Sequence, residues 1–109
     1  MVRLTTYQLV DASDTIVRGT ITDVWTELDL RGLVWTRAQV EVDEVLKGEA
    51  DTRAVVVDQM GGTWAGRSLR VAGVASLSLG EDAVFFLEEL GNGQTVTVGM
   101  FQGKFTILD

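Results

Sequence analysis

The sequence predicts a small all-β domain in which an antiparallel sheet curls upon itself and carries one short N-terminal helix. Three observations predict it. Residues 33–48 alternate between apolar and polar side chains over ten positions, which is the period of a half-buried strand. Turns that contain glycine or asparagine separate several further short apolar runs. Helical periodicity does not recur after Ser13, so the sheet must supply most of the core.

The strand predicted over residues 33–48 separates its side chains by parity. One face carries Val34, Thr36, Ala38, Val40 and Val42, and the other carries Trp35, Arg37, Gln39, Glu41 and Asp43. The alternation slips after Asp43, because Val45 and Leu46 follow each other before a Lys-Gly turn signal. This slip predicts a bulge or sharp bend near Glu44. The strand therefore turns a corner, and we expect a curled sheet rather than a flat one.

A short helix is predicted at the N-terminus. Thr5 suits the N-cap position, and Gln8 lies three residues later, where its side chain reaches back to the cap. The polar residues that follow end the helix early. We expect Leu9, Val10 and Ala12 to pack it onto the sheet.

Further strands are predicted from the other apolar runs. They cover residues 15–25, 54–57, 68–72, 83–87 and 95–100, with a last strand at Phe105 and Ile107. The runs at 54–57 and 83–87 are apolar on both parities, so we expect both of their faces to be covered. Gly19 lies inside the first of these strands, where it predicts tight curvature or the close crossing of another backbone.

The connections between these strands follow from their turn signals. Residues 27–32 are expected to join the first two strands as an antiparallel hairpin. If this loop is centred on Leu30, Trp25 and Trp35 lie roughly opposite each other, as aromatic cross-strand pairs do. The glycine-rich residues 61–66 are expected to form a loop, and Asn92 with Gly93 predicts a hairpin turn.

Composition narrows the classes of function. The 109 residues suffice for one domain, 1–109, with a single core. Sixteen acidic residues against nine basic ones give a net charge of −7, which argues against nucleic acid as the ligand. The chain has no cysteine and no histidine, which removes thiolate chemistry and the commonest general base and metal ligand. No apolar run reaches membrane-spanning length and no signal peptide precedes Leu4, so we expect no membrane span.

Three segments resemble the recurring blocks of the netrin-like and TIMP-like OB-fold domains. They are ASDTIVRGTI at 12–21, VDEVLKG at 42–48 and LGEDAVFFL at 79–87, and the resemblance extends over about residues 5 to 90. It implies a small OB-like antiparallel barrel. Similar bacterial proteins are exported, which implies a periplasmic or secreted domain, and modulation of an extracytoplasmic protease is the sharpest function that it implies. Inhibitors of the TIMP kind chelate a protease zinc through an N-terminal cysteine, which this chain lacks, so that route is not carried over.

The predicted binding surface combines aromatic side chains, a neighbouring cation and a glycine-rich loop. Its residues are Trp25, Trp35, Arg37, Gly61, Gly62 and Trp64. Exposed tryptophan beside arginine is typical of protein interfaces, so we expect another protein as the partner. The alternative is that the tryptophans cover the ends of the barrel, since tryptophan is usually largely buried.

Several other functions compete with this prediction. The domain is alternatively a structural accessory without a ligand, or an oligosaccharide-binding OB-fold. We expect no enzyme, cofactor or metal; the enzymatic alternative is a hydrolase that pairs Ser68, Ser76 or Ser78 with Lys47 or Lys104. An anion cradle of backbone N–H groups in residues 61–66 is a weaker hypothesis. A surface calcium site at Glu27 and Asp29 is weaker still, because arginine occupies the fifth position of the loop.

Overall fold

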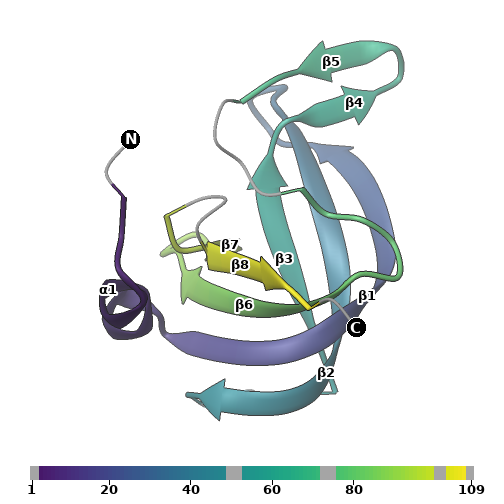
Figure 1. The fold of residues 1–109 in the computed structure, drawn as a ribbon. Helices are drawn as coiled ribbons and strands as arrows, with labels where there is room; N and C mark the ends of the chain where they lie inside the picture. The colour runs from purple at the N-terminus through teal and green to yellow at the C-terminus, as the bar shows by residue number, and fades with distance from the viewer. Residues whose placement is uncertain (1–2, 49–52, 72–75, 100–102, 108–109) are drawn as a thin grey trace.

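The computed structural model describes residues 3–48, 53–71, 76–99 and 103–107, in which one helix and eight strands are assigned (Figure 1). These elements are α1 (Thr6–Ala12), β1 (Thr15–Leu28), β2 (Val34–Lys47), β3 (Ala54–Met60), β4 (Gly62–Trp64), β5 (Arg67–Leu69), β6 (Asp82–Glu89), β7 (Thr95–Thr97) and β8 (Lys104–Thr106). The predicted class, an antiparallel β protein with one short N-terminal helix, is confirmed. Two predicted strand ends, Ala72 and Met100, lie outside the described residues.

β1 is the central strand of the main sheet. The strand order is β3-β2-β1-β6-β7, and β8 also pairs with β6; every pairing is antiparallel. The sheet curls so strongly that β7 lies near β3, although these strands stand at opposite ends of the order (Figure 1). The curled sheet is thus confirmed. The ladders of the described residues end at β3 and at β7 and do not close the sheet into a barrel.

The bend predicted near Glu44 is present in the β1–β2 pairing. Val17 is opposite Val45 and Arg18 is opposite Glu44, but Gly19 is opposite Val42, so the register skips one residue of β2. A second irregularity follows at Leu46. Extra residues of this kind increase the local twist of a strand, which accounts for the curl.

Gly19 is required by the close approach of β2. A Cβ atom at this position would lie 2.6 Å from Val40 Cγ1 and closer still to the carbonyl oxygen of Glu41. Real Cβ atoms do not approach other atoms so closely, so any side chain would force the two strands apart. The predicted close crossing at Gly19 is confirmed.

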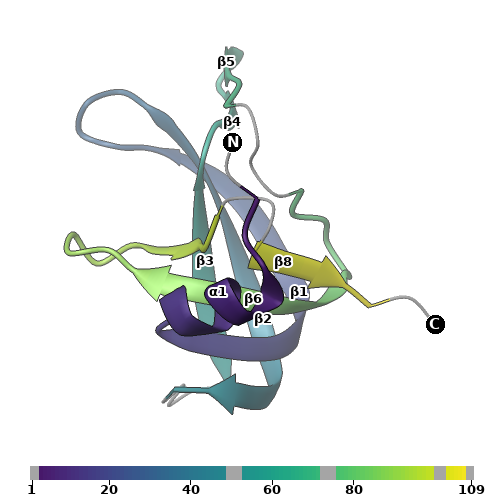
Figure 2. The ribbon, with the colours of Figure 1, turned by 60° about the vertical axis from the view of Figure 1, so that its left-hand side comes forward.

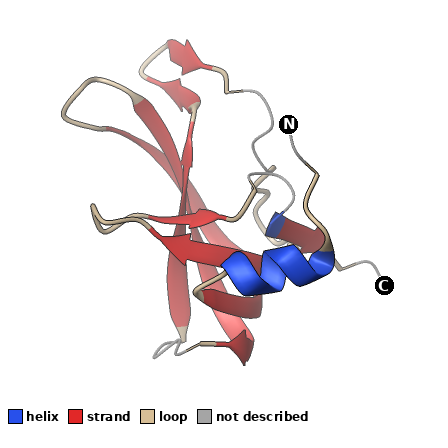
Figure 3. Ribbon diagram, turned by 90° about the vertical axis from the view of Figure 1, so that its left-hand side faces the viewer, coloured by secondary structure: helices blue, strands red, loops and turns tan. Residues whose placement is uncertain are grey.

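Two apolar clusters lie on opposite faces of β1 and β6. One fills the inside of the curl and consists of Val17, Ile21, Ala38, Val40, Val57, Ala83, Phe85 and Leu87. The other consists of Leu9, Ile16, Phe86 and Val98, and it lies between these strands and α1 (Figure 3). Because β6 contributes to both clusters, the expectation that residues 83–87 are covered on both faces is confirmed.

The N-terminal helix begins as predicted but packs more sparsely. Gln8 N donates to Thr5 Oγ1 and Thr5 N donates to Gln8 Oε1, which completes the capping box. Of the three residues expected to face the sheet, only Leu9 is buried; Val10 and Ala12 are exposed, so that part of the prediction is wrong. A helix of seven residues makes fewer than two turns, and only one of its apolar positions faces the strands.

Two predictions about pairing are wrong. Trp25 is opposite Arg37, and Trp35 is opposite Glu27, so the two tryptophans are not a cross-strand pair. The hairpin is centred one residue later than expected, because Asp29 N donates to Leu33 O and fixes the loop at 29–33.

The prediction that both faces of residues 54–57 are covered is also wrong. β3 ends the strand order, and Val56 is 41% exposed.

The glycine-rich residues 61–66 are not a simple loop. β4 and β5 pair with each other as a separate two-stranded hairpin, with Ala65 and Gly66 at its turn. This hairpin extends beyond the main sheet at the end where β2 begins and β3 ends (Figures 1 and 2). The prediction of a loop at residues 61–66 therefore missed the strand β4.

Candidate functional site

Trp35 lies under the 29–33 loop and is only 6% exposed. Its Nε1 donates to Asp29 Oδ2 at 2.9 Å, while Asp29 Oδ1 accepts from the backbone N–H groups of Arg31 and Leu33. The hydrogen bond from Trp35, and then that from Leu33, lower the pKa of Asp29 below its ordinary value. Trp35 is thus an anchor for the loop, which corresponds to the alternative of a covering tryptophan and not to an exposed contact residue.

Arg37 is held by two carboxylates on neighbouring strands. Its Nε lies 2.8 Å from Glu27 Oε2 on β1, and its Nη1 lies 3.0 Å from Asp58 Oδ1 on β3. Asp58 is 5% exposed, and its other oxygen accepts from Thr95 N of β7 at 3.2 Å. One chain of polar contacts therefore runs across β1, β2 and β3 to β7. Arg37 is part of this framework, in which it forms two ion pairs.

Trp25 is half-buried beside this framework. Its Nε1 donates to Glu27 Oε1 at 3.3 Å, and its position in the ladder is opposite Arg37. The structure therefore brings Trp25, Arg37 and Glu27 together, with Trp35 opposite Glu27. This group is the part of the predicted surface that forms one site.

Gly61 and Gly62 act through the backbone. Gly61 N donates to Val34 O at 2.7 Å, and Gly61 O accepts from Thr36 Oγ1 at 2.7 Å. Both glycines have positive φ angles, and a Cβ atom on Gly62 would collide with Thr36 Oγ1. They allow the chain to leave β3 and enter β4 in contact with β2. Since Gly61 N–H is already used, the anion cradle loses one of the donors on which it depended.

The β4–β5 hairpin carries exposed side chains that the framework does not use. Trp64 is 38% exposed and lies opposite Arg67 in the hairpin ladder, and Arg70 is also exposed. Residues 61–71 contain these two arginines and no acidic residue, in a chain with a net charge of −7. Within the described ranges, neither arginine has an ion-pair partner, whereas Arg18 and Arg31 are paired with carboxylates.

The base of the hairpin is attached to the main sheet. Thr26 Oγ1 of β1 donates to Thr63 O of β4 at 2.9 Å, and the Thr63 and Ser68 hydroxyls lie 3.0 Å apart. The bonds from Thr26 to Thr63 and from Thr36 to Gly61 hold the hairpin base against β1 and β2, whereas the contact between Thr63 and Ser68 joins β4 to β5. The hairpin presents Trp64 and its arginines from an ordered base.

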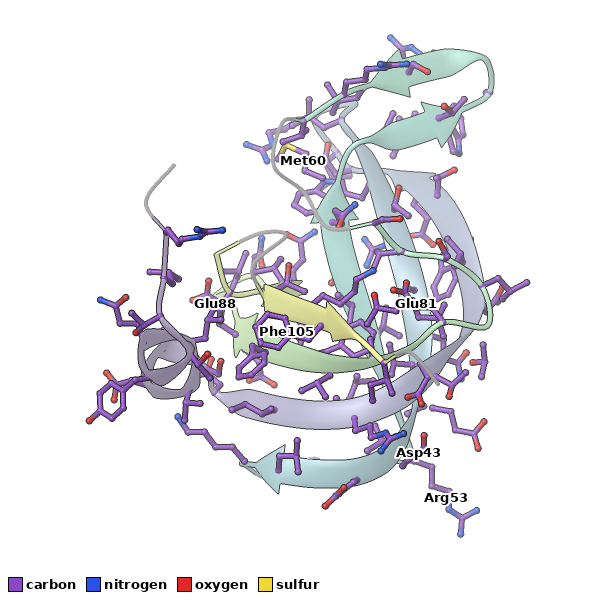
Figure 4. The ribbon with its side chains drawn as sticks, in the orientation of Figure 1. Asp43, Arg53, Met60, Glu81, Glu88 and Phe105 are labelled. Carbon is purple, nitrogen blue, oxygen red and sulfur yellow. The ribbon has the colours of Figure 1, made fainter. Side chains whose placement is uncertain are left out.

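A cavity of about 310 Å³ lies between β3 and β7, where the curled sheet comes round toward itself. Its described lining residues are Trp35, Asp58, Gln59, Met60, Val71, Glu88, Val96, Thr97 and Gly99. Met60 is at the end of β3, and Glu88 is on β6 (Figure 4). An adjoining space of about 590 Å³ at the hairpin base shares Gln59, Met60 and Val71. The end of the sheet near the hairpin is therefore hollowed.

A third opening, of about 610 Å³, lies between the 29–33 loop and the turn that joins β6 to β7. Its described lining residues are Asp29, Leu30, Arg31, Trp35, Arg37, Asn92 and Gln94. Trp35 also borders the cavity between β3 and β7. The predicted residues Trp35 and Arg37 thus contribute to open spaces, although Trp35 Nε1 donates to Asp29 and Arg37 forms ion pairs with Glu27 and Asp58.

Lys104 forms a nearly buried ion pair with Glu81. Lys104 Nζ lies 2.8 Å and 2.7 Å from the two carboxylate oxygens, and the two side chains are 8% and 12% exposed. Burial alone raises the pKa of Glu81, but hydrogen bonds from Lys104 and Thr106 outweigh it, so the pKa lies below its ordinary value. Lys104 also donates to the backbone oxygen of Ser76.

This ion pair bears on the hydrolase alternative. Ser76 and Ser78 do lie near Lys104, but they use backbone atoms: Ser76 accepts from Lys104, and Ser78 N donates to Glu81. In the described part of the chain, no serine hydroxyl is hydrogen-bonded to Lys104. Lys104 Nζ is instead directed to the Glu81 carboxylate and to the backbone oxygen of Ser76. The arrangement offers no activated nucleophile at this position.

The remaining chemical hypotheses concern metal ions, and the arrangement of the acidic side chains gives them little support. Over residues 3–48, 53–71, 76–99 and 103–107, no group of three or more acidic side chains is arranged to hold a metal ion. The carboxylate of Asp29, half of the proposed calcium site, is occupied by hydrogen bonds from its own loop. Of the helices that the structure describes, none is long and apolar enough to cross a membrane.

Three residues of these sites were missed from the sequence. Asp58 ends an apolar run and gave no signal beyond being the first charge after it, and Arg70 was not connected with Trp64 because a hairpin was not expected there. Glu88 resembled a solvated surface acid. The comparisons with known proteins add nothing to the assignment: neither the protein-family models, nor the curated proteins, nor the solved structures gave a match to this chain.

Proposed function

We propose that this chain is an OB-like, netrin-like β domain that acts as a non-enzymatic binding module for another protein. OB-folds are five-stranded, partly open barrels. The five strands β3-β2-β1-β6-β7, with β7 curled back near β3, support this type. The family resemblance points to an extracytoplasmic protease as the partner.

The observation that carries the proposal is the projecting β4–β5 hairpin. It offers Trp64 opposite Arg67, with the exposed Arg70 directly after β5, and tryptophan and arginine are among the residues most enriched at the energetic centres of interfaces. The other aromatic and cationic residues of the predicted surface are Trp25, Trp35 and Arg37, and each has a carboxylate partner within the framework. A partner surface that carries carboxylates around an apolar slot fits this hairpin.

Affinity capture with matched variants tests the proposal. The wild-type chain, a Trp64→Ala/Arg67→Ala variant and an Arg3→Ala/Tyr7→Ala variant serve as baits in extracts of the source cells. The control also removes an exposed arginine and an exposed aromatic residue, but from the N-terminal segment. We expect the hairpin variant alone to lose the captured protein, and we expect the capture to weaken with salt. Equal capture by all three baits contradicts the proposal.

A second candidate function is the binding of an oligosaccharide. Other OB-folds bind such ligands with the loop between their first two strands and a later hairpin loop. The opening of about 610 Å³ lies between the 29–33 loop and the β6–β7 turn and is lined by the amide side chains of Asn92 and Gln94. A glycan array followed by Asn92→Ala and Gln94→Ala variants tests it, and the absence of any saturable binding excludes it.

A further inference from the structure

The cavity between β3 and β7 has mainly apolar walls. Trp35, Met60, Val71 and Val96 line it, and they come from β2, β3, the segment after β5, and β7. The single polar atom of the Trp35 side chain already donates to Asp29, so the indole offers only apolar and π surface to a ligand. These walls favour a ligand with an apolar body.

Two acidic residues are among the described residues that line the same cavity, Asp58 and Glu88, and they differ in their partners. Asp58 is bound by Arg37 at 3.0 Å and by Thr95 N at 3.2 Å. Glu88 is half-buried, and across the described ranges its carboxylate has no hydrogen bond or ion pair. A carboxylate beside apolar walls is stabilised most by a cation that donates hydrogen bonds to it.

Size and charge restrict the ligand further. The volume of about 310 Å³ is near the lower end of the range for small-molecule pockets, about 300–1,000 Å³. It is about twice the 150 Å³ or so that accommodate benzene in an engineered protein cavity. The net charge of −7 attracts cations and repels anions. One aromatic ring with a short alkylammonium chain has a suitable size and charge.

We propose that this cavity binds a compact organic ammonium ion, with its apolar body against Trp35, Met60 and Val96 and its cationic group paired with Glu88. The site does not depend on the hairpin that carries the proposed protein contact, because Trp64 and Arg67 do not line it. Failure of one proposal therefore leaves the other standing.

Titration of the ¹⁵N-labelled chain with 2-phenylethylammonium tests the site, with neutral 2-phenylethanol as the matched ligand. We expect saturable shifts at the amides of Val96 and Thr97 and at the Trp35 indole N–H. The alcohol should bind at least about tenfold more weakly, since hydrogen bonds to a charged group are worth about 1.5–3 kcal/mol. Equal affinity for the two ligands, or no shift at these positions, overturns the proposal.

Variants of the chain separate the cavity from non-specific attraction. Glu88→Gln should weaken binding of the ammonium about tenfold, whereas Glu89→Gln removes the same charge one residue away and should leave it unchanged. Val96→Phe fills the cavity and should abolish the shifts. Unchanged affinity in Glu88→Gln, or in Val96→Phe, overturns the proposal, and a ¹⁵N spectrum of each variant checks that it is folded.

Discussion

Trp35 and Trp64 occupy two regions that use the same kind of side chain in opposite ways. In the framework of β1, β2, β3 and β7, Trp35 is 6% exposed and donates to Asp29. In the β4–β5 hairpin, Trp64 is 38% exposed. The arginines differ in the same way, since Arg37 has two carboxylate partners while Arg67 has none among the described residues. Residue type alone does not decide whether a side chain stabilises the fold or is available to bind a partner. The groups that surround it in the chain decide this.

The comparison also separates stability from function. Framework side chains are bonded to one another, so their removal should cost folding free energy. Hairpin side chains project from a base that is hydrogen-bonded to the main sheet, so their removal should weaken binding and change the stability of the fold little. The following substitutions test this division in order of expected size.

Gly19→Val should have the largest effect on stability. The new side chain would collide with Val40 and with the backbone of Glu41, so β1 and β2 would have to separate. We expect a loss of about 4 kcal/mol or a failure to fold, which is at the upper end for overpacking. Urea denaturation measures it. Gly91→Ala is the control, because Gly91 is exposed and nothing lies within 4 Å of a Cβ there. A similar loss of stability in both variants would show that the close approach of β2 to Gly19 is not the cause.

Trp35→Ala should cost about 3 kcal/mol, the usual loss when a large buried aromatic side chain is removed. Trp64→Ala should change stability by less than about 0.5 kcal/mol. Urea denaturation of both variants gives the free energies of unfolding. Equal losses would show that the hairpin tryptophan is also part of the framework, and the proposed division would then be wrong.

Lys104→Met should cost about 2 kcal/mol at pH 7, since it leaves Glu81 charged and nearly buried without its counter-ion. The pKa of Glu81 is lower in the folded chain than its ordinary value. Its contribution to stability is therefore present above the unfolded pKa of about 4.3 and is lost as the pH falls through the folded pKa. Urea denaturation at pH 7, 5 and 3 should show the difference between wild type and variant shrinking with acid. A constant difference would mean that Lys104 stabilises the fold without its charge.

Thr36→Val should cost less global stability than Gly19→Val, Trp35→Ala or Lys104→Met, about 1 kcal/mol, because it removes one hydrogen bond to Gly61 O. It should act mainly on the base of the hairpin. Amide hydrogen exchange of β4 and β5 should accelerate more than that of β1. Unchanged exchange in the hairpin would show that this hydroxyl does not hold it.

The fold was predictable where the signals are local. The capping box of Thr5 and Gln8, the alternation of residues 38–43 and the Asn-Gly turn each depend on only a few neighbouring residues. Gly19 was predictable for a related reason, because a glycine inside a strand typically marks a bulge, a tight bend or a close backbone approach. These features needed no knowledge of distant parts of the chain.

The site was harder to predict because its partners are distant in sequence. The hairpin register depends on which loop atoms Asp29 binds, and the role of Arg37 depends on Asp58 of another strand. The β4–β5 hairpin turns through Ala65 and Gly66, both with positive φ, although alanine rarely adopts that conformation. The usual Asn-Gly or Asp-Gly signature was therefore missing, and the segment resembled a loop.

The central position of β1 has a consequence for the order of folding. Its ladder with β2 joins neighbouring parts of the chain, but its ladder with β6 pairs Thr15 with Leu87. During synthesis the β1–β2 hairpin can therefore form early, while the other edge of β1 stays without its partner until most of the chain has been made. Such long-range pairing slows folding and leaves a strand edge open to aggregation in the meantime.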